Sequence, residues 1–375
     1  MNRQSEEPAR NAAGKQRRRR AVSRAVSSIG IPLGLCLAST AASAQQVTLY
    51  GTIDTGLTYI SNSAGGKLIE MQPNIMWKSA FGLRGSEDLG GGTQAVFDVS
   101  KTFNTSTGAD YGFGPSIGLS NDRWGTLTMG QLNDFMFLSL TVQRWGPELY
   151  SMPPYNSSAG PFTSLGLTFG STDFNGTAGW YVFNNAVSYR SPTIDGLTIG
   201  AMYAFGNVAG HVGRGATQSY GADYSLGPLQ LDAAYTFSRS ADMVVDGGAL
   251  RNWGFGGRLA VGSAWLDALY TNTRNTGLGT GVQVLSAGGQ FPVTRNTVMS
   301  LNYHYDWANA AAHSYHAHQI SAGLFYGFSR RTDVYATLTW QRASGNGATA
   351  MVDYTMARSS TASQTVARVG ITHRF

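Results

Sequence analysis

Apolar and polar residues alternate along most of the chain after about residue 45. The alternation is clearest in three well-separated segments, residues 47–60, 229–238 and 299–307. A period of two places the two sets of side chains on opposite faces of a β-strand. Asp54, Asp232 and Asp306 stand in the polar rows, which argues against a soluble sandwich with an apolar interior. The pattern predicts an all-β chain whose apolar rows face lipid and whose polar rows face water.

The last ten residues, 366–375, continue the alternation and end in an aromatic. Ala367, Val369 and Ile371 precede Phe375 at alternate positions, with His373 in the same row. A soluble protein rarely ends in this way, because an exposed strand edge is prone to pair with other chains. In a transmembrane barrel the last strand pairs with the first, and a terminal aromatic lies at the lipid interface. We therefore interpret Phe375 as an assembly signal.

Turn-forming residues divide the alternating segments into hairpins. Seven short breaks are typical of tight turns and lie at residues 87–92, 121–123, 191–196, 225–228, 262–263, 291–293 and 329–332. Eight longer polar segments lie near residues 61–74, 104–112, 133–183, 207–217, 239–250, 274–281, 308–314 and 343–363. These fifteen connections join sixteen strands. The chain is thus predicted to form a 16-stranded antiparallel transmembrane β-barrel, which is wide enough for an aqueous channel.

The third long segment, residues 133–183, exceeds the length of an ordinary hairpin loop. It carries apolar and aromatic residues, such as Phe135, Trp145 and Phe162, that a solvent-exposed disordered loop would not need. We expect this third loop to fold into the lumen, pack on the inner wall and narrow the channel. An extracellular cap over the barrel mouth is the alternative.

The first 44 residues have the pattern of an export signal. They hold eight basic and two acidic side chains, a mostly apolar segment from Ala25 to Ala38, and the cleavage pattern Ala42-Ser-Ala44. We expect residues 1–44 to be a cleaved signal peptide and residues 45–375 to form a barrel in the bacterial outer membrane.

The composition of the remaining chain favours a barrel over other exported proteins. Without the leader, 19 basic and 19 acidic residues remain, so the pI of about 9.4 gives no indication of nucleic-acid binding. The 48 glycines suit turns, and the aromatic share of 11% suits interface girdles. Cys36, the single cysteine, lies in the leader, so no thiol chemistry is expected. No later stretch approaches the ~20 apolar residues of a spanning helix.

Several motifs across nearly all of residues 46–375 resemble the Gram-negative porin family, in its beta-proteobacterial, trimeric, general-diffusion form. In chain order they are Val47-Thr-Leu-Tyr-Gly-Thr-Ile-Asp54, Gly82-Leu-Arg-Gly-Ser-Glu-Asp-Leu-Gly-Gly-Gly92, Gly125-Thr-Leu-Thr-Met-Gly130, Pro147-Glu148, Asn184-Asn-Ala-Val-Ser-Tyr189, Gly200-Ala-Met-Tyr203, Arg331-Thr-Asp-Val-Tyr335 and His373-Arg-Phe375. The resemblance implies a homotrimer and a constriction where wall arginines face acids on the third loop. Further expected partners are outer-membrane lipids, the barrel-assembly machinery, and small hydrophilic solutes and ions.

The chain departs from the family pattern at three positions where relatives carry wall arginines. Ala80, Phe113 and Gln131 stand there instead. A basic wall thinned in this way, with its acids retained, predicts a pore that is near neutral or mildly cation-preferring. The strong anion preference associated with parts of the family is therefore not expected here.

Candidate constriction residues follow from the polar faces and the long loop. The basic candidates on the wall are Arg84, Arg258 and Lys78. The acidic candidates on the third loop are Glu148, Asp134 and Asp173. Further lumen-facing candidates are Asp54, Asp98 and Gln131. For Arg84 the alternative is a structural wall cluster that does not control flux. For Glu148, Asp134 and Asp173 it is a solvated or loop-bracing carboxylate.

Other chemistry has weaker support in the sequence. His313, His316 and His318 include an H-x-H pair on one strand face, but no carboxylate or cysteine lies close by in sequence. Residues 277–281 are glycine-rich without the strand–helix context of a phosphate loop. No cofactor, metal or catalytic residue is therefore expected. The predicted function is an outer-membrane porin for passive diffusion, with a substrate-specific channel or an outer-membrane barrel enzyme as alternatives.

Overall fold

The computed structural model describes residues 46–143, 160–165, 182–244, 248–352 and 357–375. All of them belong to the compact unit Ser43–Phe375. Its strands are β1 (Gln46–Ser63), β2 (Gly66–Pro73), β3 (Ala80–Gly90), β4 (Thr93–Phe103), β5 (Asp110–Asn121), β6 (Gly125–Asn133), β7 (Val182–Arg190), β8 (Leu197–Ala204), β9 (Thr217–Leu226), β10 (Leu229–Ser238), β11 (Leu250–Val261), β12 (Ala264–Asn275), β13 (Gly281–Pro292), β14 (Thr297–Ala308), β15 (His316–Gly327), β16 (Thr332–Ser344) and β17 (Ser363–Arg374).

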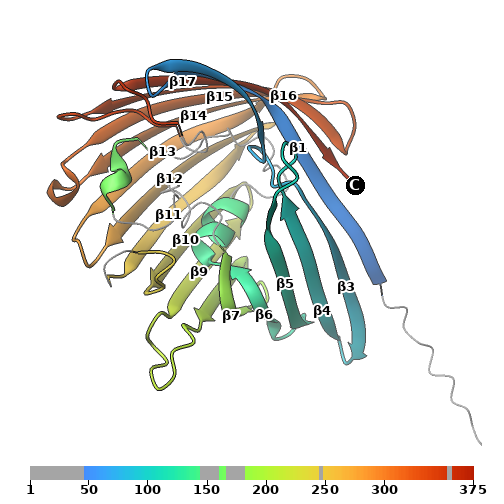
Figure 1. The fold of residues 1–375 in the computed structure, drawn as a ribbon. Coiled ribbons are helices and arrows are strands. Elements are labelled where there is room, and N and C mark those ends of the chain that lie inside the picture. Colours follow the sequence, from blue (N-terminus) through green and yellow to red (C-terminus); the bar gives the residue numbers. More distant parts are fainter. Residues whose placement is uncertain (1–45, 144–159, 166–181, 245–247, 353–356) are drawn as a thin grey trace, which may run out of the picture. The chain divides into compact units, whose positions relative to one another are not determined.

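Neighbouring strands pair antiparallel in chain order, and β1 pairs with β17, so the sheet closes on itself (Figure 1). β2 and β3 pair with successive parts of β1, residues 55–63 and 46–52. They therefore occupy one place in the ring, and the seventeen strand segments form a closed 16-stranded antiparallel β-barrel. Because the last strand pairs with the first, the sheet has no open seam, as a hydrocarbon environment requires. This confirms the predicted fold class.

The connections match the predicted division into short turns and long loops, with one exception. Each predicted short turn lies between two consecutive strands, as between β9 and β10 or between β11 and β12. The first long segment, residues 61–74, was predicted as a loop, but it forms the hairpin of β1 and β2 around Ala64 and Gly65. Backbone pairing does not depend on an apolar composition, so the polar residues of this segment were misleading. The break in the strand lies at residues 74–79 instead.

The two faces of the strands differ as their alternation predicts. On β1, Leu49 and Leu57 are 60% and 56% exposed, whereas Asp54 and Thr58 are fully buried. Exposed apolar residues recur on the same outer face of other strands, for example Leu231 on β10 and Leu301 on β14. Such an outer face suits lipid, while the polar rows point to the barrel interior. Among the described residues, no helix is long and apolar enough to cross a membrane.

Candidate channel interior

The third loop begins with a short helical segment that packs on the inner face of the barrel. It comprises α1 (Phe135–Phe137) and one π-helical turn, η1 (Leu138–Gln143). Asp134 caps α1, since its side chain accepts the N–H of Phe137 at 3.1 Å. The same carboxylate accepts the hydroxyl of Thr236 on β10 at 2.5 Å, and Ser219 on β9 accepts the N–H of Phe135. Asp134 and Phe135 of the segment and Ser219 and Thr236 of the wall are all buried, so these hydrogen bonds hold the segment on the inner wall.

Two glycines make room for this contact. A Cβ atom on Gly200 of β8 would lie 2.0 Å from the Phe135 ring, and one on Gly221 of β9 would lie 2.5 Å from it. Phe135 and Leu140 are also buried against apolar residues of the inner face, including Leu269 on β12. The glycines therefore allow an aromatic ring to lie directly on the sheet, where any larger residue would displace it.

A second described piece of the third loop packs further around the barrel. This is the 3-10 helix η3 (Phe162–Leu165). Phe162 and Leu165 are buried against Val282 and Val284 on the inner face of β13. The hydroxyl of Thr280 donates to the carbonyl of Leu165 at 3.0 Å. The two described pieces thus contact separate parts of the inner wall, β8–β12 and β13.

Arg84 lies on the inner row of β3, directly opposite Asp98 of β4. The Asp98 carboxylate accepts the hydroxyl of Tyr50 at 2.6 Å, and the Arg84 guanidinium lies 5.1 Å from the centre of the Tyr50 ring. Arg84 is exposed, and Asp98 is partly exposed. The candidate arginine therefore faces a wall carboxylate on its neighbouring strand, which partly cancels its field.

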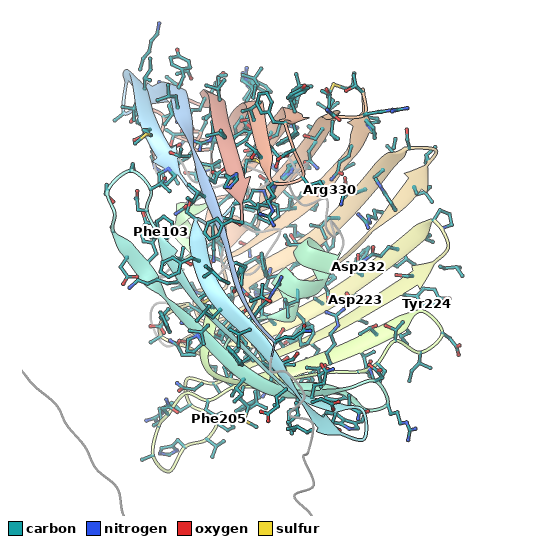
Figure 2. All side chains as sticks on the ribbon, turned by 90° about the vertical axis from the view of Figure 1, so that its right-hand side faces the viewer. Phe103, Phe205, Asp223, Tyr224, Asp232 and Arg330 are labelled. Atoms are coloured by element: carbon teal, nitrogen blue, oxygen red, sulfur yellow. The ribbon has the colours of Figure 1, made fainter. Side chains whose placement is uncertain are left out.

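Two further arginines on the inner wall also lie near aspartates. Arg258 of β11 stands opposite Asp267 of β12, donates to Gln230 at 3.2 Å, and lies 4.1 Å from the Trp265 ring centre. Arg190 of β7 forms an ion pair with Asp223 of β9 at 2.9 Å. Asp223 in turn lies directly opposite Asp232 of β10 (Figure 2). Neither Arg190 nor Asp223 was singled out by the sequence, although both are charged residues within polar rows.

Gln131 turns inward because the strand is irregular there. The register between β6 and β7 shifts between Gly130 and Leu132, and Gly130 has a φ of +138°, which favours glycine. Gln131 donates to Asn184 at 2.8 Å and lines an inner cavity of about 450 Å³ together with Asp98 and Arg190.

The other two positions where relatives carry wall arginines, Ala80 and Phe113, lie on different faces of the barrel. Ala80 lies on the inner row of β3, in step with Gly82 and Arg84. Phe113 is 54% exposed on the outer face of β5, in the same row as Ile117 and Leu119. Because β5 alternates regularly here, an arginine at position 113 would point outward and not into the lumen. The interpretation of Phe113 as a missing wall arginine was wrong.

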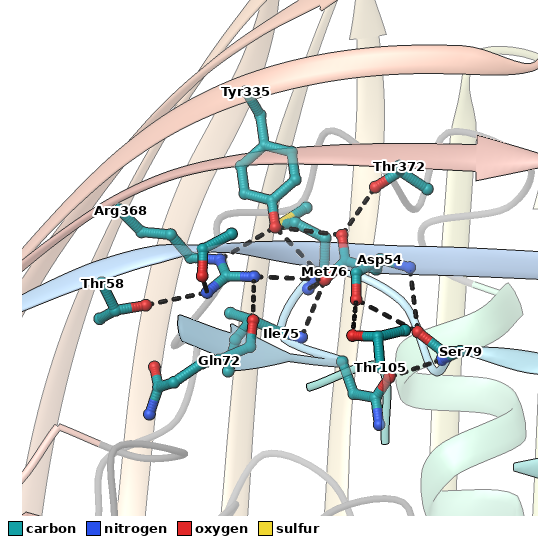
Figure 3. A network of polar contacts seen from close by, with 12 residues as sticks. Asp54, Thr58, Gln72, Ile75, Met76, Ser79, Thr105, Tyr335, Arg368 and Thr372 are labelled. Carbon is teal, nitrogen blue, oxygen red and sulfur yellow. Dashed lines mark hydrogen bonds and ion pairs between the residues drawn. The ribbon is translucent and has the colours of Figure 1, made fainter. Parts of the chain in front are cut away.

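Asp54 points to the barrel interior but is fully buried. Its carboxylate accepts the backbone N–H groups of Ile75 and Met76 at 3.1 and 3.3 Å, and the hydroxyls of Tyr335 and Thr372 at 3.0 and 2.7 Å (Figure 3). The segment 74–79 thus covers this carboxylate. Asp54 does not line the open lumen, contrary to its place among the lumen-facing candidates.

Arg368 of β17 completes this buried network. Its guanidinium lies 3.5 Å from the Asp54 carboxylate and donates to Thr58, to the carbonyl of Gln72, and to the hydroxyl of Tyr335. Both charged side chains have no exposed surface. The network joins β1, β2, β16 and β17, so it braces the seam where the barrel closes (Figure 3).

The remaining candidates lie elsewhere. Lys78 is exposed in the connection between β2 and β3. Glu148 and Asp173 lie outside the described residues. Asp134, buried under the loop it caps, has the bracing role given above as the alternative. His316 and His318 share the outer row of β15 and contact the hydroxyls of Tyr305 and Tyr303. Within the described part of the chain, no group of three histidine, cysteine or acidic residues could hold a metal ion.

The comparisons with known proteins agree with this architecture. A family model described as Gram-negative porin matches residues 33–367, and the chain therefore belongs to that family. It is 29% identical over 366 residues to outer membrane porin protein 32 of Delftia acidovorans, covering 92% of this chain and 99% of that protein. It is 25% identical over 333 residues to an outer membrane porin protein of Bordetella pertussis, covering 79% of each.

A solved structure supports the same assignment. The anion-selective porin from Comamonas acidovorans superimposes with a TM-score of 0.74 at 25% identity, covering 88% of this chain and all of that one. Family, fold and relatives together identify an outer-membrane porin of the Gram-negative type.

Proposed function

We propose that the barrel encloses a water-filled channel through which small hydrophilic solutes and ions cross the outer membrane by passive diffusion. The observation that carries this proposal is the closed 16-stranded sheet with apolar residues outside and charged residues on its inner wall. The wall supplies fixed charges and hydrogen-bonding groups, and no covalent step is required. Single-channel recording of the purified protein in a planar bilayer tests it, with the design given at the end of the Discussion.

The third loop narrows this channel. Its two described pieces, η1 and η3 with their flanking residues, are buried against the inner faces of β8–β12 and β13. In the sequence, Glu148 lies between these two pieces and Asp173 follows the second. Glu148 is the acid we propose at the constriction, opposed by Arg84 and Arg258 on the wall.

The balance of wall charges favours weak ion selectivity. Arg84, Arg190 and Arg258 each lie near an aspartate: Asp98, Asp223 and Asp267. Asp232 and Asp306 also lie in inward rows, but both are buried, as Asp54 is, so they are not counted among the charges of the open lumen. Ala80 and Gln131 are neutral at inner positions. The anion selectivity named for the Comamonas acidovorans porin is therefore not transferred to this chain.

We expect the zero-current potential of the wild-type channel across a KCl gradient to lie near zero or slightly on the cation-selective side. Gln131→Arg should move it toward anion selectivity, because the new charge enters an inner cavity. Arg84→Ala should move it toward cation selectivity, since Asp98 then loses its opposing charge. All shifts should shrink in concentrated salt, as the Debye length falls to about 3 Å at 1 M.

Phe113→Arg is the matched control for Gln131→Arg, because residue 113 lies on the outer face. In a correctly assembled barrel it should leave the potential almost unchanged. A strongly anion-selective wild-type channel at low salt would contradict the proposed balance of wall charges.

Export and assembly follow from the same proposal. Residues 1–44 direct export and are removed, and residues 45–375 are inserted by the barrel-assembly machinery and associate as a homotrimer. The position of Phe375 supports the proposal that it is an assembly signal. Its backbone N–H and carbonyl both form hydrogen bonds with Gly51 at 3.0 Å, and its ring lies over that glycine.

A further inference from the structure

Residues 74–79 leave the wall of the barrel partway along β1. Residues 55 and 52 of β1 pair with Pro73 at the end of β2 and with Ala80 at the start of β3. Regular pairing leaves room for two residues between these partners, but the chain has six there. The surplus residues do not fit in the sheet, so this connection, which we call the seam segment, projects from it.

The packing of the seam segment shows that it projects into the barrel. Met76 is buried against Phe325 of β15 and Tyr335 of β16, and Trp77 packs against the same cluster. Both partners of Met76 point inward. Leu324, the neighbour of Phe325, is exposed on the outer face, and the Tyr335 hydroxyl belongs to the buried network described above. The seam segment therefore lies on the inner faces of β15 and β16.

Hydrogen bonds hold the seam segment in this position. Asp54 accepts two backbone N–H groups of the segment, and the Ser79 hydroxyl in turn accepts the N–H of Asp54 at 2.9 Å (Figure 3). The Asn74 side chain donates to the carbonyl of Phe103 at 3.1 Å and accepts the N–H of Ser79 at 2.8 Å. Asn74 has a φ of 63°, a left-handed conformation that asparagine adopts more readily than most residues. The segment is thus an ordered part of the inner surface.

Lys78 occupies the side of the seam segment that points away from the wall. Met76 and Ser79 are buried, whereas Lys78 between them is exposed. Because the buried side of the segment rests on the inner wall, its exposed side faces the lumen. A lysine there places a positive charge inside the channel, where walls of low dielectric focus its field on passing ions.

The seam segment covers a different part of the wall from the described pieces of the third loop. Those pieces contact β8–β12 and β13, and the seam segment contacts β15 and β16. The inner rows of β4, β5 and β6 are only half-buried, as Ser100, Ser116 and Thr128 show. The open part of the lumen therefore adjoins these strands. Lys78, two residues before the start of β3, lies at its border.

We propose that the seam segment is a second element that narrows the channel, and that Lys78 is a selectivity-determining residue of the lumen. The inference rests on the proposed channel function. It adds to the wall residues Arg84 and Arg258 a basic group that an inward segment carries. Lys78 attracts anions and repels cations, so it offsets part of the negative charge that passing ions meet.

Charge reversal at Lys78 tests this role in planar bilayers. Lys78→Glu should raise the permeability ratio of K⁺ to Cl⁻ at least about twofold, as obtained from the zero-current potential in a KCl gradient at low salt. Lys67→Glu is the matched control, because Lys67 is exposed beside the turn of the β1–β2 hairpin, outside the seam segment. It should leave the ratio close to that of the wild type. An unchanged ratio in Lys78→Glu, or equal shifts in both variants, would overturn the proposal.

Lys78→Cys tests the same position after folding is complete. Cys36, the single cysteine of the chain, lies in the leader, so the introduced thiol is the only one in residues 45–375. An aminoethyl thiosulfonate restores an ammonium group and should restore wild-type selectivity. A sulfonatoethyl thiosulfonate of similar size should reproduce the shift of Lys78→Glu. Neither reagent should change the selectivity of Lys67→Cys.

The outcomes separate this inference from the proposed function. Wild-type protein that forms no channel would overturn both. A conducting wild type, with a selectivity that neither Lys78→Glu nor complete modification of Lys78→Cys changes, would place residue 78 outside the conduction path and overturn this inference alone.

Discussion

Asp54→Asn should lower the free energy of unfolding of the barrel by about 3–5 kcal/mol, because it leaves the fully buried Arg368 guanidinium without its opposing charge. The asparagine would also weaken the contacts that hold Ile75 and Met76 in the connection between β2 and β3. The expected result is a lower urea midpoint of the protein in detergent micelles, measured by tryptophan fluorescence. Less heat-modifiable barrel should also be recovered on refolding.

A double-mutant cycle isolates the ion pair from the rest of this network. Asp54→Asn/Arg368→Gln removes both charges, so it should cost less than the sum of the two single variants. Thr48→Ala is the control on the inner row of the same strand, where the side chain is exposed, and should change stability by no more than about 0.5 kcal/mol. Strictly additive losses would show that Asp54 and Arg368 do not stabilise each other across the seam.

Deletion of Phe375 is expected to remove most of the heat-modifiable trimer from the outer membrane. The last residue makes two backbone hydrogen bonds with Gly51, and its ring covers that glycine at the closing edge. Without it, β17 loses its final contact with β1, and the terminal aromatic at the lipid interface is gone. The amount of folded protein in isolated outer membranes, read on unheated gels, measures the effect.

Two substitutions separate the contribution of the Phe375 ring to assembly from that of its backbone hydrogen bonds. Phe375→Tyr keeps the aromatic ring and both hydrogen bonds, and should assemble nearly as wild type does. Phe375→Ala keeps only the hydrogen bonds, so poor assembly of this variant would assign the role to the ring. Normal amounts of trimer from the deletion variant would refute the assembly role altogether.

The barrel could be predicted from the sequence because its two faces meet different solvents. Alternation between lipid-facing residues such as Leu49 and inward residues such as Thr48 is enforced on every strand, so strands and turns follow from the pattern. The hairpin of β1 and β2 was the exception. It has too few apolar residues to show that pairing continues there, since residues 66–73 mix Lys67 and Glu70 with Leu68 and Ile69.

The interior was harder to predict, because a single strand gives no information about what covers its inner face. Asp54 stands in an inward row, but its burial depends on a connection some twenty residues later and on Arg368 of the last strand. Asp134 looked like a channel acid, yet its carboxylate caps α1 and bonds to Thr236. Both carboxylates are used for structure through contacts between segments far apart in the sequence.

Register also limits what a motif can predict. Phe113 was matched to a wall arginine of the family, but the regular alternation of β5 places it outside with Ile117 and Leu119. Gln131 faces inward only because the register shifts after Gly130. One added residue reverses the face of every later side chain, so irregularities of this kind decide which positions reach the lumen.

The unit conductance in planar bilayers, recorded over a KCl series for the wild type and for a variant with residues 145–175 shortened, tests most directly whether the barrel holds a channel that the third loop narrows. We predict discrete steps whose size rises in proportion to salt concentration, and larger steps for the shortened variant. Conductance that saturates or is blocked by one solute would indicate a substrate-specific channel instead. Absence of steps from correctly folded protein, or equal steps in both proteins, would contradict the account.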